Sequence, residues 1–472
     1  MALPAQRAQT WEIRLATPGC FPAPLNPKFE IRNSKFLIPT PFLYPCSAMR
    51  PADPAALEND PLLRRVWNAL GRPRCHLTGG YLRDRLLGRI STDLDLSMDG
   101  EPEDAAGPAR SLAEHLGVRA HLLGTAPQQV WRIETPELKV ELWPRGGLEL
   151  DDDIERRDFS CNALMWEFPD GPLVDRVGGL DDIEERRLRA ISRSNLEDDP
   201  VRLLRAPRFL AQLPGFTLEP ESAGWIRSLA PQLSSSPRER VGQELLKLLG
   251  APSAERGLRE LIELGLFAPS APASVDPDPA WLEVNLHAAS RLSRAATHPL
   301  PSAVHEAGIA AGLGLLLRAW GLPTIHVVGT YAWGSSHRRH ATYAADHLDD
   351  LANAVDAPPG ERRLVIHRAG TAFPAALALA AAIEPNRHGW RRWWQLWQRR
   401  GPELIAPEPL LSGPEVMDLL DLAPGPELGA TFRAVTDAQI RGEVRSREGA
   451  RRWLREWAER RGRTRAELGI RN

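Results

Sequence analysis

The stretch Leu77-Thr-Gly-Gly-Tyr-Leu-Arg-Asp-Arg-Leu-Leu-Gly88 is followed a few residues later by Thr92-Asp-Leu-Asp-Leu96. Paired glycines at the end of an apolar run let the backbone approach a polyphosphate closely. Asp93 and Asp95 are two residues apart, so on a strand their side chains point to the same face, while the leucines between them pack into the sheet. Together the two stretches indicate metal-dependent nucleotide chemistry.

The two carboxylates carry the metal hypothesis. Magnesium prefers hard oxygen ligands and is usually held by one or two carboxylates together with substrate phosphates. An Asp-x-Asp pair at a strand edge is therefore suited to two ions beside a bound nucleotide. A lone Asp-x-Asp is also typical of a solvated strand end or turn, but the Gly79-Gly80 turn just upstream favours the nucleotide site.

These residues resemble the signature of the class II tRNA nucleotidyltransferase and bacterial poly(A) polymerase family, which includes the CCA-adding enzymes. Four further blocks resemble motifs of that family and occur in the same order, at residues 156–164, 175–183, 198–209 and 238–249. The resemblance implies an α+β protein, in which a small nucleotidyltransferase head with a mixed sheet is followed by all-α neck, body and tail domains.

The resemblance also implies roles for individual residues. Asp93 and Asp95 are the expected metal ligands, and Glu141 is the candidate third carboxylate, with an exposed strand glutamate as the alternative. Asp158 is expected to contact ribose, and Asn162 would share its face if this stretch is helical. The expected nucleotide-binding residues are Gly79, Gly80, Arg83, Arg157, Asp158, Asn162, Asp199, Arg202 and Arg205.

Asp199 and Arg202 are the expected base-reading pair. A carboxylate accepts from an exocyclic amino group and a guanidinium donates to a ring acceptor, so the pair can select C or A over U and G. The family motif has Glu before this Asp, whereas this chain has the shorter Asp198. The alternative is an acidic first helical turn that is favoured by the helix dipole.

The segment between Glu141 and Arg156 departs from the family pattern. Fifteen positions separate the two residues, which leaves no room for the flexible loop that full CCA-adding members use to add the terminal A. By resemblance, this predicts an enzyme that adds two C residues from CTP to the tRNA 3′ end and stops, so that a separate A-adding enzyme could complete the end. Full CCA, A or poly(A) addition, in some cases with ATP, and a catalytically idle tRNA-binding protein remain as alternatives.

Composition sets wider limits. The chain of 472 residues has 43% hydrophobic and 25% charged residues, as in ordinary globular proteins. Its net charge of −2 means that RNA must be held by local basic patches. The longest uncharged apolar run, around residues 370–383, falls short of the ~20 residues that a bilayer requires. Four cysteines without metal-ligand spacing favour a reducing cytoplasm.

Periodicity predicts alternating helices and strands up to about residue 150. The predicted strands are residues 75–78, 93–97, 118–123, 129–134 and 138–143, and the predicted helices are 62–70, 82–87 and 105–116. No clear strand pattern recurs after about Glu197. The expected domains are a disordered or misassigned extension over 1–58, a head over 59–190, neck helices over 191–265, a helical body over 266–400 and a tRNA-binding tail over 401–472.

For two clusters in the C-terminal half, a structural role is favoured over a functional site. His326, His337, His340 and His347 lack a carboxylate-rich frame, which favours helix-surface positions over a metal site. Four tryptophans between residues 390 and 397 recur at helical spacing, which favours a core stripe, although basic residues between them would also suit RNA. The chain has no His-Asp doublet, so we expect no metal phosphohydrolase activity.

Overall fold

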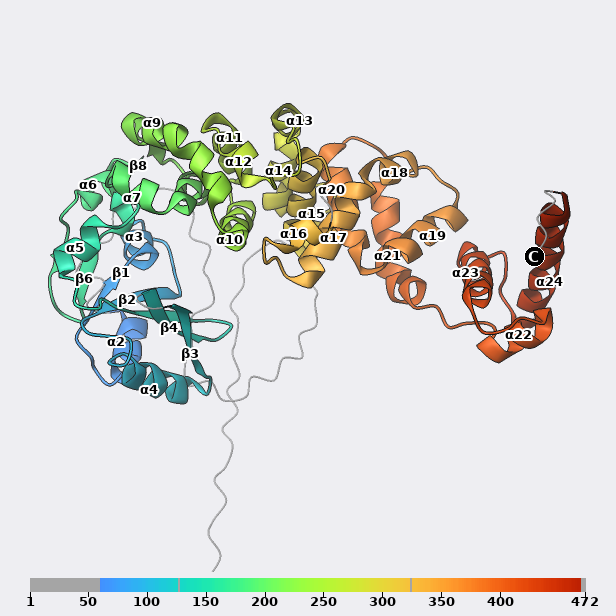
Figure 1. Ribbon diagram of the computed structural model, residues 1–472, viewed down its shortest axis with the longest axis horizontal. Helices are drawn as coiled ribbons and strands as arrows, with labels where there is room; N and C mark the ends of the chain where they lie inside the picture. Colours follow the sequence, from blue (N-terminus) through green and yellow to red (C-terminus); the bar gives the residue numbers. More distant parts are fainter. Residues whose placement is uncertain (1–59, 126–127, 323–324, 468–472) are drawn as a thin grey trace, which may run out of the picture. The chain divides into compact units, whose positions relative to one another are not determined.

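The computed structural model describes residues 60–125, 128–322 and 325–467. The extension expected over residues 1–58 lies outside these ranges. The strands of the head and the helices that follow are shown in chain order in Figure 1. The proposed domain limits remain predictions.

The head contains one seven-stranded sheet in the order β3-β4-β5-β2-β1-β6-β7. Its strands are β1 (Cys75–Thr78), β2 (Asp93–Met98), β3 (Ala120–Thr125), β4 (Gln128–Glu134), β5 (Lys139–Pro144), β6 (Met165–Phe168) and β7 (Leu173–Val174). β2 and β5 are parallel and the other neighbouring strands are antiparallel. The predicted mixed sheet is therefore confirmed.

Helices and turns connect these strands. They are α2 (Pro61–Ala69), α3 (Gly80–Leu86), α4 (Ala106–Leu116), α5 (Leu150–Glu155), η1 (Ser160–Asn162) and α6 (Gly179–Glu184). The start of α2 follows from its sequence, because Asp60 accepts a hydrogen bond from the Leu62 amide and proline occupies the first helical position. Leu94 and Leu96 are buried, as the alternation in β2 predicts.

The neck is mostly helical. Its elements are β8 (Arg187–Leu188), α7 (Arg193–Asp198), η2 (Pro200–Leu204), α8 (Arg205–Gln212), β9 (Thr217–Leu218), α9 (Pro220–Leu229), η3 (Ala230–Ser235), α10 (Arg238–Leu249) and α11 (Ala254–Glu263). β8 and β9 pair in parallel. The predicted, mostly helical remainder is confirmed, and the two-residue β9 within it is too short to show a period in the sequence.

The body is built around a buried helix, α20. Its elements are α12 (Phe267–Ser270), α13 (Pro279–Val284), α14 (Leu286–Ser293), η4 (Ala295–Thr297), α15 (Pro301–Ala319), α16 (Ile325–Gly329), α17 (Ser335–Asp346), α18 (Leu348–Asn353), α19 (Pro359–Ala369), η5 (Gly370–Ala372), α20 (Phe373–Ile383) and α21 (Trp390–Ile405). α20 packs against α14, α15 and α17. The segment Pro359–Ile383 is long and apolar enough to span a membrane, but 72% of its apolar window is buried within the protein, as in a core helix.

Three of the four tryptophans of α21 belong to this core. Trp390, Trp393 and Trp394 are buried, which confirms the core interpretation for them, whereas Trp397 is partly exposed. In the described part of the chain, no group of three or more His, Cys, Asp or Glu side chains has the arrangement of a metal site. The histidines at 326, 337, 340 and 347 accordingly form no such cluster.

The tail forms a separate small core. Its helices are α22 (Gly413–Leu420), α23 (Pro426–Arg441) and α24 (Arg447–Glu467). Val416, Val435 and Leu454 lie in its centre, one from each helix. Ser412 and Glu415 form a capping box at the start of α22.

Candidate active site

Two neighbouring strands place three carboxylates side by side. The parallel register of β2 and β5 pairs Asp93 with Lys139 and Asp95 with Glu141. Because alternate residues of a strand share a face, all four side chains lie on the same face of the sheet. Glu141 is 5% exposed, so it is not the exposed strand glutamate that we considered as the alternative.

Gly79 allows the turn before α3 to approach this cluster. Its φ of +71° lies in the left-handed region, which favours glycine. A Cβ at this position would lie 2.7 Å from Oδ2 of Asp95. Glycine is therefore required here by the carboxylate itself, in addition to any bound phosphate.

The cluster carries more negative than positive charge. Burial, together with the charges of Asp93 and Glu141, raises the pKa of Asp95 to about 7. Nζ of Lys139 lies 2.9 Å from Asp93 and 3.2 Å from Glu141, and Nη2 of Arg132 lies 2.6 Å from Glu141. Asp93 and Asp95 offer two hard oxygen donors, which could hold a divalent cation together with substrate phosphates, although the described side chains form no complete metal site by themselves.

The carboxylates line a cavity of about 1310 Å³, to which the head and neck both contribute. Two arginines of the head lie in its wall. Arg83 donates to Oδ1 of Asn162 over 2.6 Å, and Arg157 donates to Asp153 over 3.2 Å. Nε of Arg157 is buried and has no hydrogen-bond partner within the described residues. Arg83 and Arg157 both line the cavity, and guanidinium groups there suit phosphate oxygens.

Asp158 is held by the neck. The side chain is 3% exposed, and Nη1 of Arg205 lies 2.6 Å from its Oδ2. Burial alone would raise the pKa of Asp158, but the charge and hydrogen bond of Arg205 lower it below its ordinary value. The stretch from Asp158 to Asn162 is not one helix, because α5 ends at Glu155 and η1 begins only at Ser160, so the condition for a shared helix face is not met.

Asp199 and Arg202 lie in the same cavity. Nε of Arg202 is 3.6 Å from Asp199, and its Nη1 donates to the carbonyls of Arg156 and Asn195 over 2.8 and 3.1 Å. Both oxygens of Asp199 also accept from Arg240 of α10, over 3.0 and 2.6 Å. Arg240 lies within the block at 238–249 but was not among the site residues predicted from the sequence.

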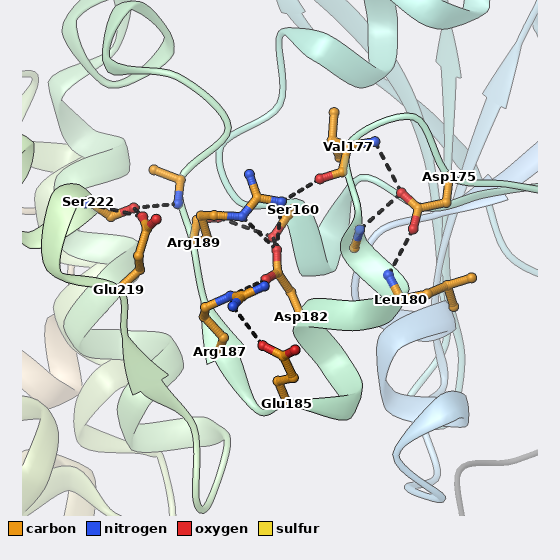
Figure 2. A network of polar contacts seen from close by, with 12 residues as sticks. Ser160, Asp175, Val177, Leu180, Asp182, Glu185, Arg187, Arg189, Glu219 and Ser222 are labelled. Carbon is orange, nitrogen blue, oxygen red and sulfur yellow. Dashed lines mark hydrogen bonds and ion pairs between the residues drawn. The ribbon is translucent and has the colours of Figure 1, made fainter.

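The block at 175–183 stabilises the last part of the head (Figure 2). The Asp175 carboxylate accepts from the amides of Val177, Gly179 and Leu180 and so caps α6. Asp182 is fully buried and accepts from Ser160 of η1 and from Arg187 and Arg189. A Cβ on Gly179 would lie 2.4 Å from the Ser160 carbonyl oxygen. The block therefore positions η1, which carries Asn162, against β8.

The sequence of this chain is similar to those of known proteins. The profile described as "Poly A polymerase head domain" matches residues 75–189, and "Probable RNA and SrmB- binding site of polymerase A" matches 215–274. The A-adding tRNA nucleotidyltransferase of Deinococcus radiodurans is 32% identical over 440 residues, which cover 82% of this chain and 96% of that protein. The chain belongs to the tRNA nucleotidyltransferase and poly(A) polymerase family.

The names of other similar proteins specify different activities. The CC-adding tRNA nucleotidyltransferase of Thermus thermophilus is 32% identical, over 80% of this chain and 92% of that protein. The crystal structure of the Bacillus stearothermophilus CCA-adding enzyme in complex with CTP has a TM-score of 0.65 at 24% identity, covering 86% of this chain and all of that one. The relatives thus identify an enzyme family, and the solved structure shows that the fold is shared.

One buried acid of the cavity, Asp153, is not among the site residues that the family resemblance implied. Asp153 is 5% exposed and accepts from Ser97 on β2, Arg156 and Arg157. The sequence offered one weak signal for it, an acidic run just before the paired arginines. Its contact with Ser97 spans 56 positions in the chain, and periodicity does not reveal such a contact.

Proposed function

We propose that this chain is a tRNA nucleotidyltransferase that adds two C residues from CTP to the tRNA 3′ end. The observation that carries CC addition is the connection between β5 and α5, which is five residues long. Its backbone is tied to the head, because the amides of Arg145 and Gly146 donate to the carbonyls of Met98 and Gly100 over 2.8 and 2.9 Å. Such a tethered connection leaves no length for a mobile loop that could reorganise the site for ATP.

The residues of the cavity have separate roles in this proposal. Asp93, Asp95 and Glu141 face the reacting atoms, and Arg83 and Arg157 bind the triphosphate. The 3′-oxygen of the tRNA forms a bond to the α-phosphorus, the bond from that phosphorus to the β-phosphate oxygen breaks, and pyrophosphate leaves. Divalent cations, for which we propose two Mg²⁺ held by Asp93 and Asp95, would make the hydroxyl more acidic and neutralise the pyrophosphate.

Asp199 and Arg202 select the base. The Asp199 carboxylate accepts from the exocyclic amino group of cytosine, and Arg202 donates to a ring acceptor. The two carbonyls that bind Nη1 of Arg202 fix its plane, and Arg240 fixes Asp199. Asp158 is positioned to receive the ribose hydroxyls. Uracil presents a carbonyl to Asp199 and is rejected.

The partners follow from this activity. We propose tRNA and CTP as substrates and a separate A-adding enzyme that completes the CCA end. The buried free thiols of Cys75 and Cys161 are consistent with the cytoplasmic location that we also propose. A-addition is the second candidate, because the Deinococcus radiodurans A-adding enzyme is similar over most of both chains.

Product lengths separate these activities. Transcripts of tRNA that end at the discriminator base, at C or at CC are incubated with Mg²⁺ and either labelled CTP or labelled ATP. We expect two C residues on the first transcript, one on the second, and no ATP incorporation on any. Addition of A to the CC-ended transcript would overturn the CC proposal and favour the second candidate. Absence of all incorporation would favour the idle tRNA-binding alternative.

A further inference from the structure

Lys139 lies among the carboxylates that the proposed metal would use. Its Nζ is 2.9 Å from Oδ1 and 3.2 Å from Oδ2 of Asp93, and 3.2 Å from Oε1 of Glu141. Its side chain is 30% exposed and lines the cavity. An ammonium group that contacts three carboxylate oxygens occupies the place of a cation.

The sheet register explains this position. β2 and β5 place Lys139 opposite Asp93, while Glu141 is two residues along the same strand and so on the same face. A long side chain at this position reaches the carboxylates on both strands. Arg132, which is opposite Glu141 on β4, approaches the same Oε1 from the other side.

The ion pairs of this cluster leave its three carboxylates unequally neutralised. Asp93 and Glu141 have a cationic partner within the described residues, whereas Asp95 has none at salt-bridge distance. A metal ion that binds Asp93 must compete with Lys139 for the same oxygens.

We propose that Lys139 is a positioning residue that acts as a resident counter-ion, holding Asp93 and Glu141 in the metal-free enzyme and withdrawing from Asp93 when a divalent cation binds. This inference rests on the proposed function, because the metal site is part of it. Metal binding then includes the cost of separating an ion pair, so this enzyme binds free metal weakly. Nucleotide phosphates supply further oxygen ligands to the metal, which offset part of that cost.

Removal of the lysine charge should therefore strengthen metal binding. Lys139→Met keeps an unbranched chain and removes the ammonium group, and Lys139→Gln is a second neutral variant in case the first folds poorly. Lys139→Arg keeps the charge. Mn²⁺ binding to the full-length protein without nucleotide is measured from the EPR signal of free Mn²⁺, so the result does not depend on activity.

We expect both neutral variants to bind Mn²⁺ about tenfold more tightly than wild type, because a competing cation has been removed. Lys139→Arg should stay within about threefold of wild type. The matched control is Lys247→Met, which removes the same charge from another lysine of the cavity that contacts Glu244 instead. Its Mn²⁺ affinity should change by less than about threefold, because the charge removed does not contact the proposed ligands.

Thermal melting gives a second readout. Without metal the neutral variants should melt below wild type, and Mn²⁺ should raise their Tm by more than it raises that of wild type. Equal or weaker Mn²⁺ binding by both neutral variants would overturn the role of Lys139. If instead Lys139→Met binds Mn²⁺ no more tightly than the double variant Lys139→Met/Asp95→Asn, the metal site of the proposed function fails, which is a distinguishable outcome.

Discussion

The two ends of the cavity balance their charges differently. At the strand end, Lys139 and Arg132 contact Asp93 and Glu141 but not Asp95, and the pKa of Asp95 is raised to about 7. At the neck end, Asp158 and Asp199 each have an arginine partner at 2.6 Å. Arg205 pairs with Asp158 and Arg240 with Asp199.

This difference divides the chemistry between the two ends. The strand end has three carboxylates and two cations, so a divalent cation would stabilise it and supply Lewis acidity to the reaction. The neck end is already neutralised, so it can bind an uncharged base through the direction of its hydrogen bonds. The comparison predicts that substitutions at the strand end remove the rate, whereas substitutions at the neck end change the choice of nucleotide.

The largest effect is expected from Asp95→Asn. The neutral amide keeps the shape of the side chain but binds a hard cation poorly, so C incorporation into tRNA should fall by about 10³-fold or more. Gel assays of labelled CTP incorporation measure this rate. A loss of less than about tenfold would break the comparison, since the strand end would then not control the rate.

Stability against pH gives an independent test of Asp95→Asn. Because the folded protein raises the pKa of Asp95 from 3.8 to about 7, the unfolded chain loses this proton at lower pH than the folded protein. Ionisation of Asp95 therefore destabilises the metal-free fold progressively from about pH 4 to pH 7, and the penalty is complete above pH 7. Metal-free Asp95→Asn should melt above wild type at pH 8, and the difference should disappear near pH 4.

The second effect concerns the buried Asp182 network, which lies outside both ends of the cavity. Asp182 is fully buried and accepts from Ser160, Arg187 and Arg189, so Asp182→Asn should destabilise the protein by about 3 kcal/mol. Urea denaturation measures this loss. Asp181→Asn, at an exposed neighbour, is the matched control and should change stability by less than about 0.5 kcal/mol. Equal stability of the two variants would show that the Asp182 contacts drawn in Figure 2 contribute little to the stability of the protein.

The sequence predicted the strand end better than the neck end. Alternation located β2 and β5, because buried Leu94 separates Asp93 from Asp95 and buried Val140 and Leu142 flank Glu141. Family resemblance supplied Asp199 and Arg202. Neither source revealed Arg240 as a partner of Asp199, 41 positions away, because long-range ion pairs follow from packing and have no local pattern. Lys139 was equally hidden, since its contact with Asp93 depends on the register of a parallel strand pair.

Arg240→Ala tests the neck end with a smaller effect. The guanidinium is half exposed, so its loss should lower stability by less than about 1 kcal/mol. Asp199 would lose two hydrogen bonds and its fixed orientation, so KM for CTP should rise about tenfold and the preference for CTP over UTP should fall.

Steady-state kinetics with each nucleotide measure both changes for Arg240→Ala. Arg193→Ala is the control, because Arg193 is exposed on α7 and contacts Ser228 rather than the base-reading pair. It should leave both values near those of wild type. A drop in kcat with an unchanged preference for CTP over UTP would show that Arg240 controls the rate and not the choice of nucleotide. That result would contradict the proposed division of roles between the two ends.

The smallest effect is expected at Asp198, which replaces the usual Glu of the family. Its carboxylate is exposed in the cavity wall and has no hydrogen bond or ion pair within the described residues. Arg240 and two backbone carbonyls already fix Asp199 and Arg202, so an orienting acid at 198 is redundant here. Asp198→Ala should change kcat/KM for CTP by less than about threefold, and Asp198→Glu should do the same. A tenfold loss in Asp198→Ala that Asp198→Glu restores would show instead that this carboxylate orients the pair once nucleotide is bound.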